Sequence, residues 1–311
     1  MAEAGFPLHT LPVGGLRGKS LRTRLSGLLN MGRSVFRAIG VLRHMRPDVV
    51  LGMGGYAAAP GGLAAWMLRT PLVIHEQNAR PGKTNLYLSR LATRVLEAFP
   101  GAIPNAGGVE LVGNPVRASL IEAAAGQHWP MDIPPRILVL GGSLGAAALN
   151  EVVPRALARL NAARPIRVLH QAGDGKAEAC LSVYREVGLD AEVVPFITDM
   201  ATAYSQSVLV ICRAGAMTLS ELMVMGRPAL LVPFPHAVDD HQFYNARYLA
   251  DAGAARILRQ NELSARRLAE ELEALLADPC QLEAMGNCAR TLARPESAER
   301  IADILEATGH A

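Results

Sequence analysis

The chain of 311 residues has few aromatic residues, three lysines and four cysteines. Cys180, Cys212, Cys280 and Cys288 form no C-x-x-C pair, which argues against a zinc site or a disulfide framework and is typical of reduced thiols in a cytosolic protein. No G-x-x-x-x-G-K-[ST] sequence occurs, so a P-loop NTPase is excluded. Since half of the residues are hydrophobic and only 19% are charged, the chain is globular rather than intrinsically disordered.

One segment resembles a membrane span in composition. Val49–Leu68 is a run of 20 residues without a charge, but it contains five glycines and Pro60. A buried strand, a glycine loop and the start of a helix explain this pattern better than a spanning helix. The chain opens without a charged segment followed by an apolar core, so we expect no signal peptide.

Acidic residues are missing from Leu16 to Pro47, although this segment holds eight basic ones, whereas the rest of the chain has 23 basic and 28 acidic residues. Leucines, Phe36 and Ile39 recur here at helical spacing. A basic helix with an apolar stripe suits an anionic membrane surface, and an ordinary solvated helix packed on its own sheet stays equally open. RNA binding is weaker because no aromatic residues are interleaved. The basic residues are Arg17, Lys19, Arg22, Arg24, Arg33, Arg37, Arg43 and Arg46.

Short apolar runs alternate with helical patterns along nearly the whole chain. Runs rich in Val, Ile and Leu without polar alternation predict strands buried on both faces of a parallel sheet, hence an α/β, doubly wound fold. We predict two domains, 1–116 and 117–294. The predicted strands are Asp48–Leu51, Leu72–His75, Arg94–Ala98, Glu110–Val112, Arg136–Leu140, Arg167–Gln171, Glu192–Phe196, Leu209–Cys212 and Ala229–Pro233, and the clearest helices are Ala146–Leu160 and Met217–Met225.

Glycine-rich turns follow three of the predicted strands, at Gly52–Tyr56, Gly141–Ala146 and Gly215–Glu221. Glycines let the backbone approach a ligand closely, and a following helix presents free N–H groups to phosphate. Three such turns indicate a nucleotide or diphosphate ligand. Gly52-x-Gly54-x-x-Ala57, with Glu76 downstream, also fits a loose dinucleotide fingerprint, so an NAD-dependent oxidoreductase stays open as an alternative.

Polar clusters follow other strands, at His75–Asn78, Gly113–Arg117 and Asp239–Asn245. Functional side chains of open α/β sheets gather at the carboxyl ends of the strands. Each cluster alone is also compatible with a helix cap or a turn. Their joint occurrence with the glycine turns favours a binding site.

Together, the motifs VLGMGGYAAAPGGLAAW, HEQN, AFPGAIPNA, VGNPVR, LGGSLGAAALN, FITDMATAY, CRAGAMTLSE and PALLVPFPHAVDDHQFYNA resemble the MurG-type peptidoglycan glycosyltransferases from about Gly15 to the C-terminus. The resemblance implies a GT-B fold, in which two Rossmann-like domains face a cleft and helix 295–311 packs back on the first. It implies inverting transfer of GlcNAc from UDP-GlcNAc to undecaprenyl-diphosphoryl-MurNAc-pentapeptide (lipid I), giving lipid II, at the cytoplasmic face of the bacterial inner membrane. The expected partners are UDP-GlcNAc, lipid I and an anionic membrane surface, and not nucleic acid. No required cofactor is implied, and the sequence gives no indication of Mg²⁺.

The resemblance also assigns site residues. A helix N-terminus with hydroxyl groups stabilises a departing diphosphate. Glu221 would accept hydrogen bonds from the ribose hydroxyls. The donor residues carried over are Asn78, Arg117, Ser143, Ile197, Ala216, Met217, Thr218, Leu219, Ser220, Glu221 and Gln242. The acceptor-side residues are Gly54, Gly55, Tyr56, His75, Glu76 and Asn85.

The first residues depart from the family pattern. Members of the family begin with a strand and a GGTGGH-like loop that contributes to the acceptor diphosphate site and holds a histidine proposed as the base, and nothing in Met1–Val13 resembles this loop. We therefore expect an incomplete first domain and leave the base unassigned, with His75 the nearest candidate. The departure favours the alternative that residues 1–311 bind the UDP-sugar without transferring it.

Overall fold

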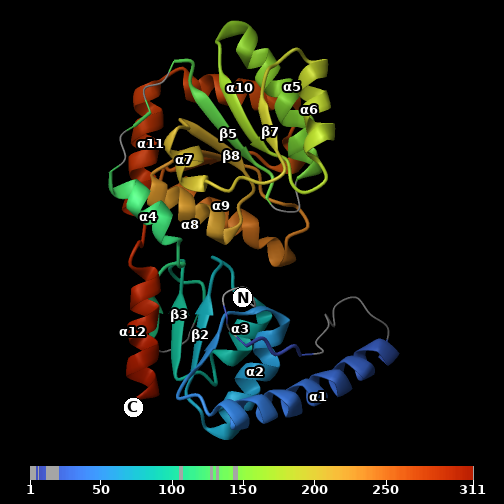
Figure 1. The fold of residues 1–311 in the computed structure, drawn as a ribbon, viewed down its shortest axis with the longest axis vertical. Coiled ribbons are helices and arrows are strands. Elements are labelled where there is room, and N and C mark those ends of the chain that lie inside the picture. Colours follow the sequence, from blue (N-terminus) through green and yellow to red (C-terminus); the bar gives the residue numbers. More distant parts are fainter. Residues whose placement is uncertain are drawn as a thin grey trace. The chain divides into compact units, whose positions relative to one another are not determined.

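The fold is described from a computed structural model, which covers residues 5, 7–11, 21–104, 108–126, 129–130, 133–142 and 146–310, without the side chains of 21–28 and 163. The chain forms two compact units, one made of Met1–Val112 with Ser297–Ala311 and the other of Gly113–Glu296 (Figure 1). The domain boundary predicted after Val116 thus falls after Val112 in the structure, and the C-terminal helix belongs to the first unit.

The first unit is built on a parallel sheet in the order β1-β2-β3-β4. The inner strand β2 is buried along its whole length, as expected for an apolar run covered on both faces. The elements are α1 (Leu21–Met45), β1 (Val50–Gly52), α2 (Gly55–Leu68), β2 (Leu72–Glu76), α3 (Lys83–Leu88), β3 (Arg94–Glu97), β4 (Val109–Leu111) and α12 (Ser297–Gly309).

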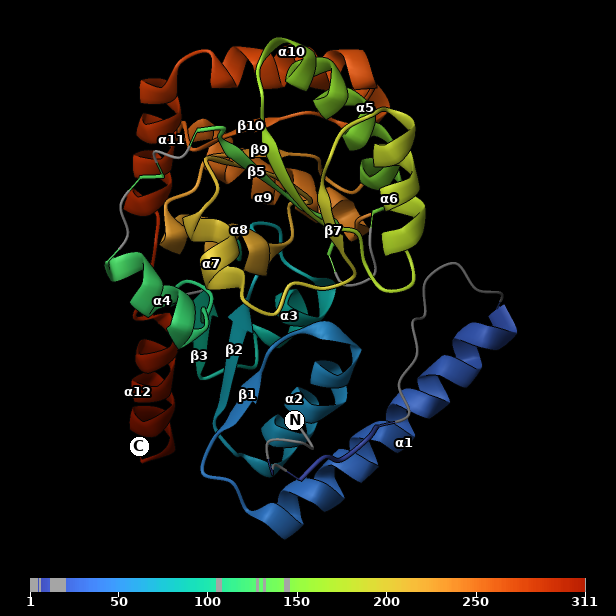
Figure 2. The ribbon, with the colours of Figure 1, turned by 45° about the horizontal axis from the view of Figure 1, so that its top comes forward.

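Helix α12 packs on this sheet although about 185 residues separate it from β4 in the sequence. Ile301 of α12 lies in one buried cluster with Val73, Leu96 and Val112. Figure 2 shows α12 beside the strands of its own unit. The apolar stripe of a helix needs a partner surface, and here that surface is the sheet of the first unit.

The charge-free run Val49–Leu68 forms β1, a glycine turn and α2, as the sequence predicts. Pro60 lies inside α2 and is buried. Among the described residues, no helix combines the length and hydropathy needed to cross a bilayer.

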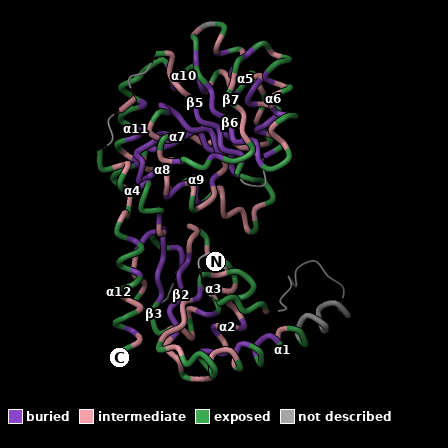
Figure 3. Tube along the Cα trace, viewed as in Figure 1, coloured by how far each residue is buried: buried purple, intermediate pink, exposed green. Residues whose placement is uncertain are grey.

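The second unit is built on six parallel strands in the order β10-β9-β8-β5-β6-β7. Its strand residues are mostly buried, and the core contains Ile137, Leu149, Leu209 and Leu272, each with no exposed surface (Figure 3). The elements are α4 (Ala118–Ala125), β5 (Arg136–Leu140), α5 (Ala147–Ala163), β6 (Arg167–Gln171), α6 (Ala177–Glu186), β7 (Glu192–Val194), α7 (Met200–Ser205), β8 (Leu209–Cys212), α8 (Ala216–Met225), β9 (Ala229–Leu231), η2 (Val238–Asp240), α9 (His241–Asp251), β10 (Ala255–Ile257), η3 (Gln260–Glu262), α10 (Ala265–Leu276) and α11 (Pro279–Thr291).

Candidate functional site

A cavity of about 370 Å³ lies in the second unit, where the central strands end. Parallel strands bring their carboxyl ends to one edge, so residues from β5, β6 and the loops after β7 and β8 meet there. The lining residues are Arg117, Leu140, Gly141, Gly142, Gln171, Phe196, Ile197, Met200, Arg213, Gly215, Thr218, Glu221 and Gln242. Five predicted donor residues therefore line one cavity, namely Arg117, Ile197, Thr218, Glu221 and Gln242.

Glu221 is the polar centre of this cavity. Its Oε1 accepts a hydrogen bond from Nη2 of Arg117 at 3.0 Å, and its Oε2 accepts one from the Tyr204 hydroxyl at 3.0 Å. Burial and the Glu221 charge raise the pKa of Tyr204 well above its usual value, so this hydroxyl stays a neutral donor. Each carboxylate oxygen keeps a further lone pair, with which it is able to accept a ligand hydroxyl.

Helix α8 presents only part of the predicted segment to the cavity. Gly215, Thr218 and Glu221 are three residues apart, which places them on one helix face toward the cavity. Leu219 is fully buried, and the Ser220 hydroxyl donates to the Ala216 carbonyl and accepts from Asn114. These two side chains therefore support the helix rather than line the cavity.

Of the remaining predicted donor residues, those that the structure describes fall outside this cavity lining. Met217 is 44% exposed, and Ala216 opens the helix after its cap, Gly215. Ser143 lies outside the described residues, so its predicted diphosphate contact stays a prediction. Asn78 belongs to the first unit, where its backbone and side-chain nitrogens donate to Glu76 Oε1 at 3.0 and 3.2 Å.

Two polar residues of the cavity lining were missed in the sequence prediction, Arg213 and Gln171. Arg213 directly follows β8 and donates to the carbonyls of Val232 and Pro233, so its guanidinium is held in place. Gln171 is the last residue of β6. Both residues lie at the carboxyl end of a strand, and this position could have identified them as candidate site residues from the sequence.

In the first unit, Glu76 organises the loop after β2. Its Oε2 accepts from the Gly82 backbone at 3.0 Å and from Asn85 Nδ2 at 2.9 Å, while its Oε1 accepts both bonds from Asn78. Glu76 is 2% exposed. Its carboxylate is therefore used within the unit, which argues against the alternative of an NAD ribose contact.

Glu97 has the same arrangement on the neighbouring strand and was missed by the sequence prediction. It pairs in register with Glu76, and its oxygens accept from the backbone nitrogens of Gly101 at 2.8 Å and Ile103 at 3.3 Å. Two buried carboxylates thus fix two successive loops at one edge of the sheet.

The glycine turn of the first unit lies against this edge. Gly54 and Gly55 have φ values of 78° and 75°, a region that favours glycine. A Cβ on Gly54 would lie 3.2 Å from Asn85 Nδ2. Tyr56 is 58% exposed, whereas His75 is fully buried and its Nδ1 lies 3.2 Å from Gln77 Nε2. A buried ring has no open path to an acceptor hydroxyl, so the structure gives His75 no support as a base.

The described residues form neither a metal-binding cluster nor a disulfide. No group of three His, Cys, Asp or Glu side chains able to hold a metal occurs among the described residues. The four cysteines are free, and burial raises the pKa of Cys212 to about 12.

Comparison with known proteins identifies relatives of both units. The glycosyltransferase family 28 N-terminal domain matches residues 1–97, and the family 28 C-terminal domain matches residues 136–301. The chain is 53% identical to the UDP-N-acetylglucosamine–N-acetylmuramyl-(pentapeptide) pyrophosphoryl-undecaprenol N-acetylglucosamine transferase of Alkalilimnicola ehrlichii, over 97% of this chain and 85% of the relative. It is 50% identical to the transferase of the same name from Methylococcus capsulatus, over 98% of this chain and 86% of the relative.

Solved structures agree with these sequence matches. The crystal structure of Acinetobacter baumannii MurG has a TM-score of 0.82 and 38% identity, and covers 98% of this chain and 86% of that one. The glycosyltransferase VinC in complex with dTDP has a TM-score of 0.62 at 17% identity, which shows a shared fold. The predicted GT-B architecture of two parallel-sheet α/β domains is confirmed. The chain belongs to glycosyltransferase family 28, among its MurG-type N-acetylglucosaminyltransferases.

Proposed function

We propose that this protein transfers GlcNAc from UDP-GlcNAc to lipid I and so forms lipid II for peptidoglycan. The observation that carries the proposal is the cavity of the second unit, where Ile197, Thr218, Glu221 and Gln242 converge in a chain of this family. An apolar wall with a few converging polar groups is typical of nucleotide sites.

The cavity suits each part of a nucleoside diphosphate sugar. Gly141 and Gly142 leave room for phosphate oxygens beside the N-terminus of α8, whose free N–H groups favour negative charge. Glu221 accepts from ribose hydroxyls. Arg213, held by two carbonyls, adds a fixed positive charge for the departing UDP.

In this proposal Gln242 contacts the sugar part of the donor. Its Oε1 accepts from the backbone nitrogen of Phe234 at 2.9 Å, which orients the amide and leaves its Nε2 as a donor. We assign this nitrogen to a GlcNAc hydroxyl. Donor binding by these side chains requires no cofactor in this proposal, so UDP affinity should be the same with Mg²⁺ and with EDTA.

Acceptor binding is assigned to the first unit. Gly54, Gly55 and Tyr56 lie at the end of β1 beside the loop that Glu76 and Asn85 hold. In this proposal Glu76 and Asn85 position the loop, and the glycine turn with exposed Tyr56 contacts lipid I.

The first unit also supplies a surface for the anionic inner membrane face. On α1, Arg33, Arg37 and Arg43 are exposed beside Leu29 and Phe36, which are 63% and 75% exposed. Neighbouring α2 adds Trp66 and Met67, each 52% exposed. Exposed apolar side chains within a basic rim suit an interface with acidic lipids. Arg17 and Lys19 lie outside the described residues, and the side chains of Arg22 and Arg24 are not described.

Vesicle sedimentation tests the membrane surface. Changing Arg33, Arg37 and Arg43 to Glu should lower binding to anionic vesicles by at least about a hundredfold, since each basic residue near such a surface contributes about 1 kcal/mol. The matched control is the same triple reversal at exposed residues of the second unit, Arg159, Arg185 and Arg266, with an identical change in net charge. Equal loss in both triple variants would contradict a defined surface.

The transfer reaction itself is tested with UDP-[¹⁴C]GlcNAc and lipid I. Radiolabelled lipid II supports the proposal and places a working base within the protein tested. Binding of UDP-GlcNAc without any product would instead support the alternative of a UDP-sugar-binding chain without turnover.

A further inference from the structure

Two residues that do not line the cavity of the second unit contact the elements that line it. Arg259 and Gln260 follow β10, the edge strand of the sheet. Strands β8, β9 and β10 are parallel neighbours, so the loops after them lie at the same end of the sheet. The Leu258 nitrogen donates to the Leu231 carbonyl at 2.9 Å, which fixes the backbone just before Arg259 to β9. Arg259 and Gln260 thus extend from a firmly held strand end.

Gln260 contacts Arg213, a cationic residue of the cavity lining. Its Oε1 accepts a hydrogen bond from Nη2 of Arg213 at 2.6 Å. Nη1 of Arg213 donates to the carbonyls of Val232 and Pro233 at 3.0 and 3.3 Å, so the guanidinium is held by the loops after both β9 and β10. These acceptors are neutral, and Arg213 forms no ion pair with any residue that the structure describes. Its positive charge is therefore fixed without being neutralised, which suits a phosphate of the ligand.

Arg259 contacts the chain on both sides of Gln242. Its Nη2 donates to Asp240 Oδ2 at 3.2 Å, and its guanidinium carbon lies 3.6 Å from the ring centre of Phe243. The ion pair is partly exposed and contributes little by itself, but the stack on the ring fixes the same guanidinium from a second direction. Arg259 thus holds the start of α9, the helix that carries Gln242.

The turn before Gln242 depends on such support. Asp239 and Asp240 have φ values of 53° and 55°, in the left-handed region that residues other than glycine seldom adopt. Residues in this region persist where the surrounding structure holds them. The Gln242 amide is oriented by the backbone nitrogen of Phe234, so a change in the turn would move the amide away from this partner. The position of the amide in the cavity therefore depends on the turn, and the turn is held by Arg259.

We propose that Gln260 and Arg259 are positioning residues of the donor site. Gln260 holds the Arg213 guanidinium toward the diphosphate, and Arg259 holds the Gln242 amide toward the sugar. This inference rests on the proposed function, because it takes the cavity to be the UDP-GlcNAc site. Binding side chains keep their geometry when a surrounding shell of contacts fixes them. Each substitution should therefore affect one part of the ligand and leave the other parts unaffected.

Calorimetry with uridine, UDP and UDP-GlcNAc tests the role of Gln260, with the uridine affinity obtained in competition with UDP. Gln260→Met keeps the length of the side chain and removes the acceptor of Arg213. It should lower UDP affinity about tenfold, through the loss of a hydrogen bond to a charged group, and leave uridine affinity within about twofold. The same substitution in an Arg213→Ala background should have no further effect, because the residue through which it acts is gone. Gln260→Ser, whose hydroxyl is too short to reach Arg213, decides this role if Gln260→Met does not fold.

Arg259→Ala should act on the sugar part of the ligand instead. The ratio of UDP-GlcNAc affinity to UDP affinity should fall about fivefold, while UDP affinity stays within about twofold of the parent. Asp240→Asn removes the ion pair from its other end with little change in volume, and it should lower the same ratio. This second variant decides the role of Arg259 if Arg259→Ala does not fold.

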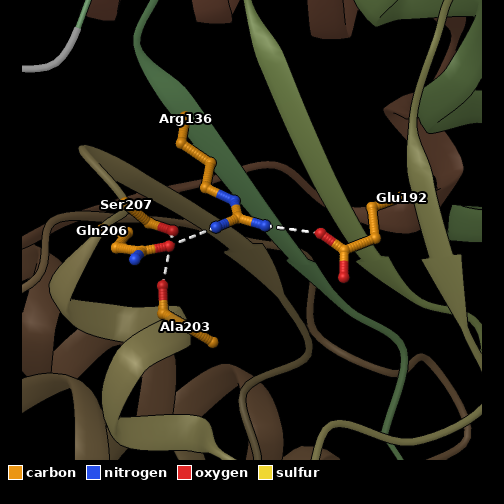
Figure 4. Close-up of polar contacts among 5 residues, drawn as sticks. All are labelled: Arg136, Glu192, Ala203, Gln206 and Ser207. Carbon is orange, nitrogen blue, oxygen red and sulfur yellow. Dashed lines mark hydrogen bonds and ion pairs between the residues drawn. The ribbon is translucent and has the colours of Figure 1, made fainter.

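Two matched controls lie in the same unit. Gln206 accepts a hydrogen bond from Arg136, which also contacts Glu192 at 2.6 Å, at the amino end of β5 (Figure 4). Gln206→Met therefore removes an arginine–glutamine contact away from the cavity. Arg247→Ala removes the ion pair with Asp251, farther along α9. Both control variants should bind uridine, UDP and UDP-GlcNAc as the parent does.

The outcomes separate the two proposals. No UDP binding by the parent overturns the proposed function. UDP binding by the parent with unchanged affinity ratios in the folded variants overturns the positioning roles alone. A proportional loss of affinity for uridine, UDP and UDP-GlcNAc also overturns them, because it shows a general effect on the fold of the unit. Equal losses in the control variants have the same meaning.

Discussion

Removing the Glu221 carboxylate should weaken nucleotide binding strongly. The carboxylate already holds Arg117 and Tyr204 at 3.0 Å each, so it is oriented before the ligand arrives. A hydrogen bond from a ribose hydroxyl to a charged, largely buried acceptor contributes about 1.5–3 kcal/mol. Glu221→Ala should therefore lower the affinity for UDP about ten- to a hundredfold, measured by calorimetry.

The same substitution leaves the buried Tyr204 hydroxyl without its acceptor, which costs about 1–3 kcal/mol of folding stability. Adding Tyr204→Phe removes that hydroxyl. The double variant should recover part of the stability and none of the UDP affinity. Recovery of both would mean that Glu221 acts through the fold. A folded Glu221→Ala variant that binds UDP as tightly as the parent would refute the placement of the ribose.

Two further predictions concern buried polar groups. The pKa of His170 is lowered to about 3 by burial, below its unfolded value of about 6.5, so the unfolded chain takes up a proton first as the pH falls. Unfolding free energy should be fully retained above about pH 6.5 and should drop by about 2 kcal/mol between pH 6.5 and pH 5, a slope that His170→Gln should remove in chemical denaturation. An equal slope in both proteins would show that other groups cause it. Glu76→Ala should remove the hydrogen bonds that hold the loop after β2. Hydrogen exchange at the Asn78 and Gly82 amides should therefore accelerate at least about tenfold. An unchanged exchange rate would show that Glu76 does not hold this loop.

The strands of the second unit were the most predictable part of the fold. β5, β6 and β8 have the predicted bounds, because continuous apolar runs ending at glycine or a polar residue mark strands buried on both faces. β7 ends at Val194, before Pro195, which lacks the N–H that would continue the ladder. β10 was missed because it has three residues at the sheet edge, with Arg256 in the middle.

The site was predictable where it depends on strand ends and less so where it depends on packing. The position of Glu221 on a helix after a glycine turn was visible in the sequence. Its contacts with Arg117 and Tyr204 were not, because they require α4, α7 and α8 to pack together. Gln171 was overlooked for a similar reason, since only the structure shows which face of β6 it occupies.

A crystal structure of the protein with saturating UDP-GlcNAc would test the central claim most directly. The account predicts nucleotide density in the cavity of the second unit, with the ribose hydroxyls within hydrogen-bond distance of Glu221 and the diphosphate at the N-terminus of α8. Density for UDP-GlcNAc elsewhere on the protein, with this cavity empty, would contradict it.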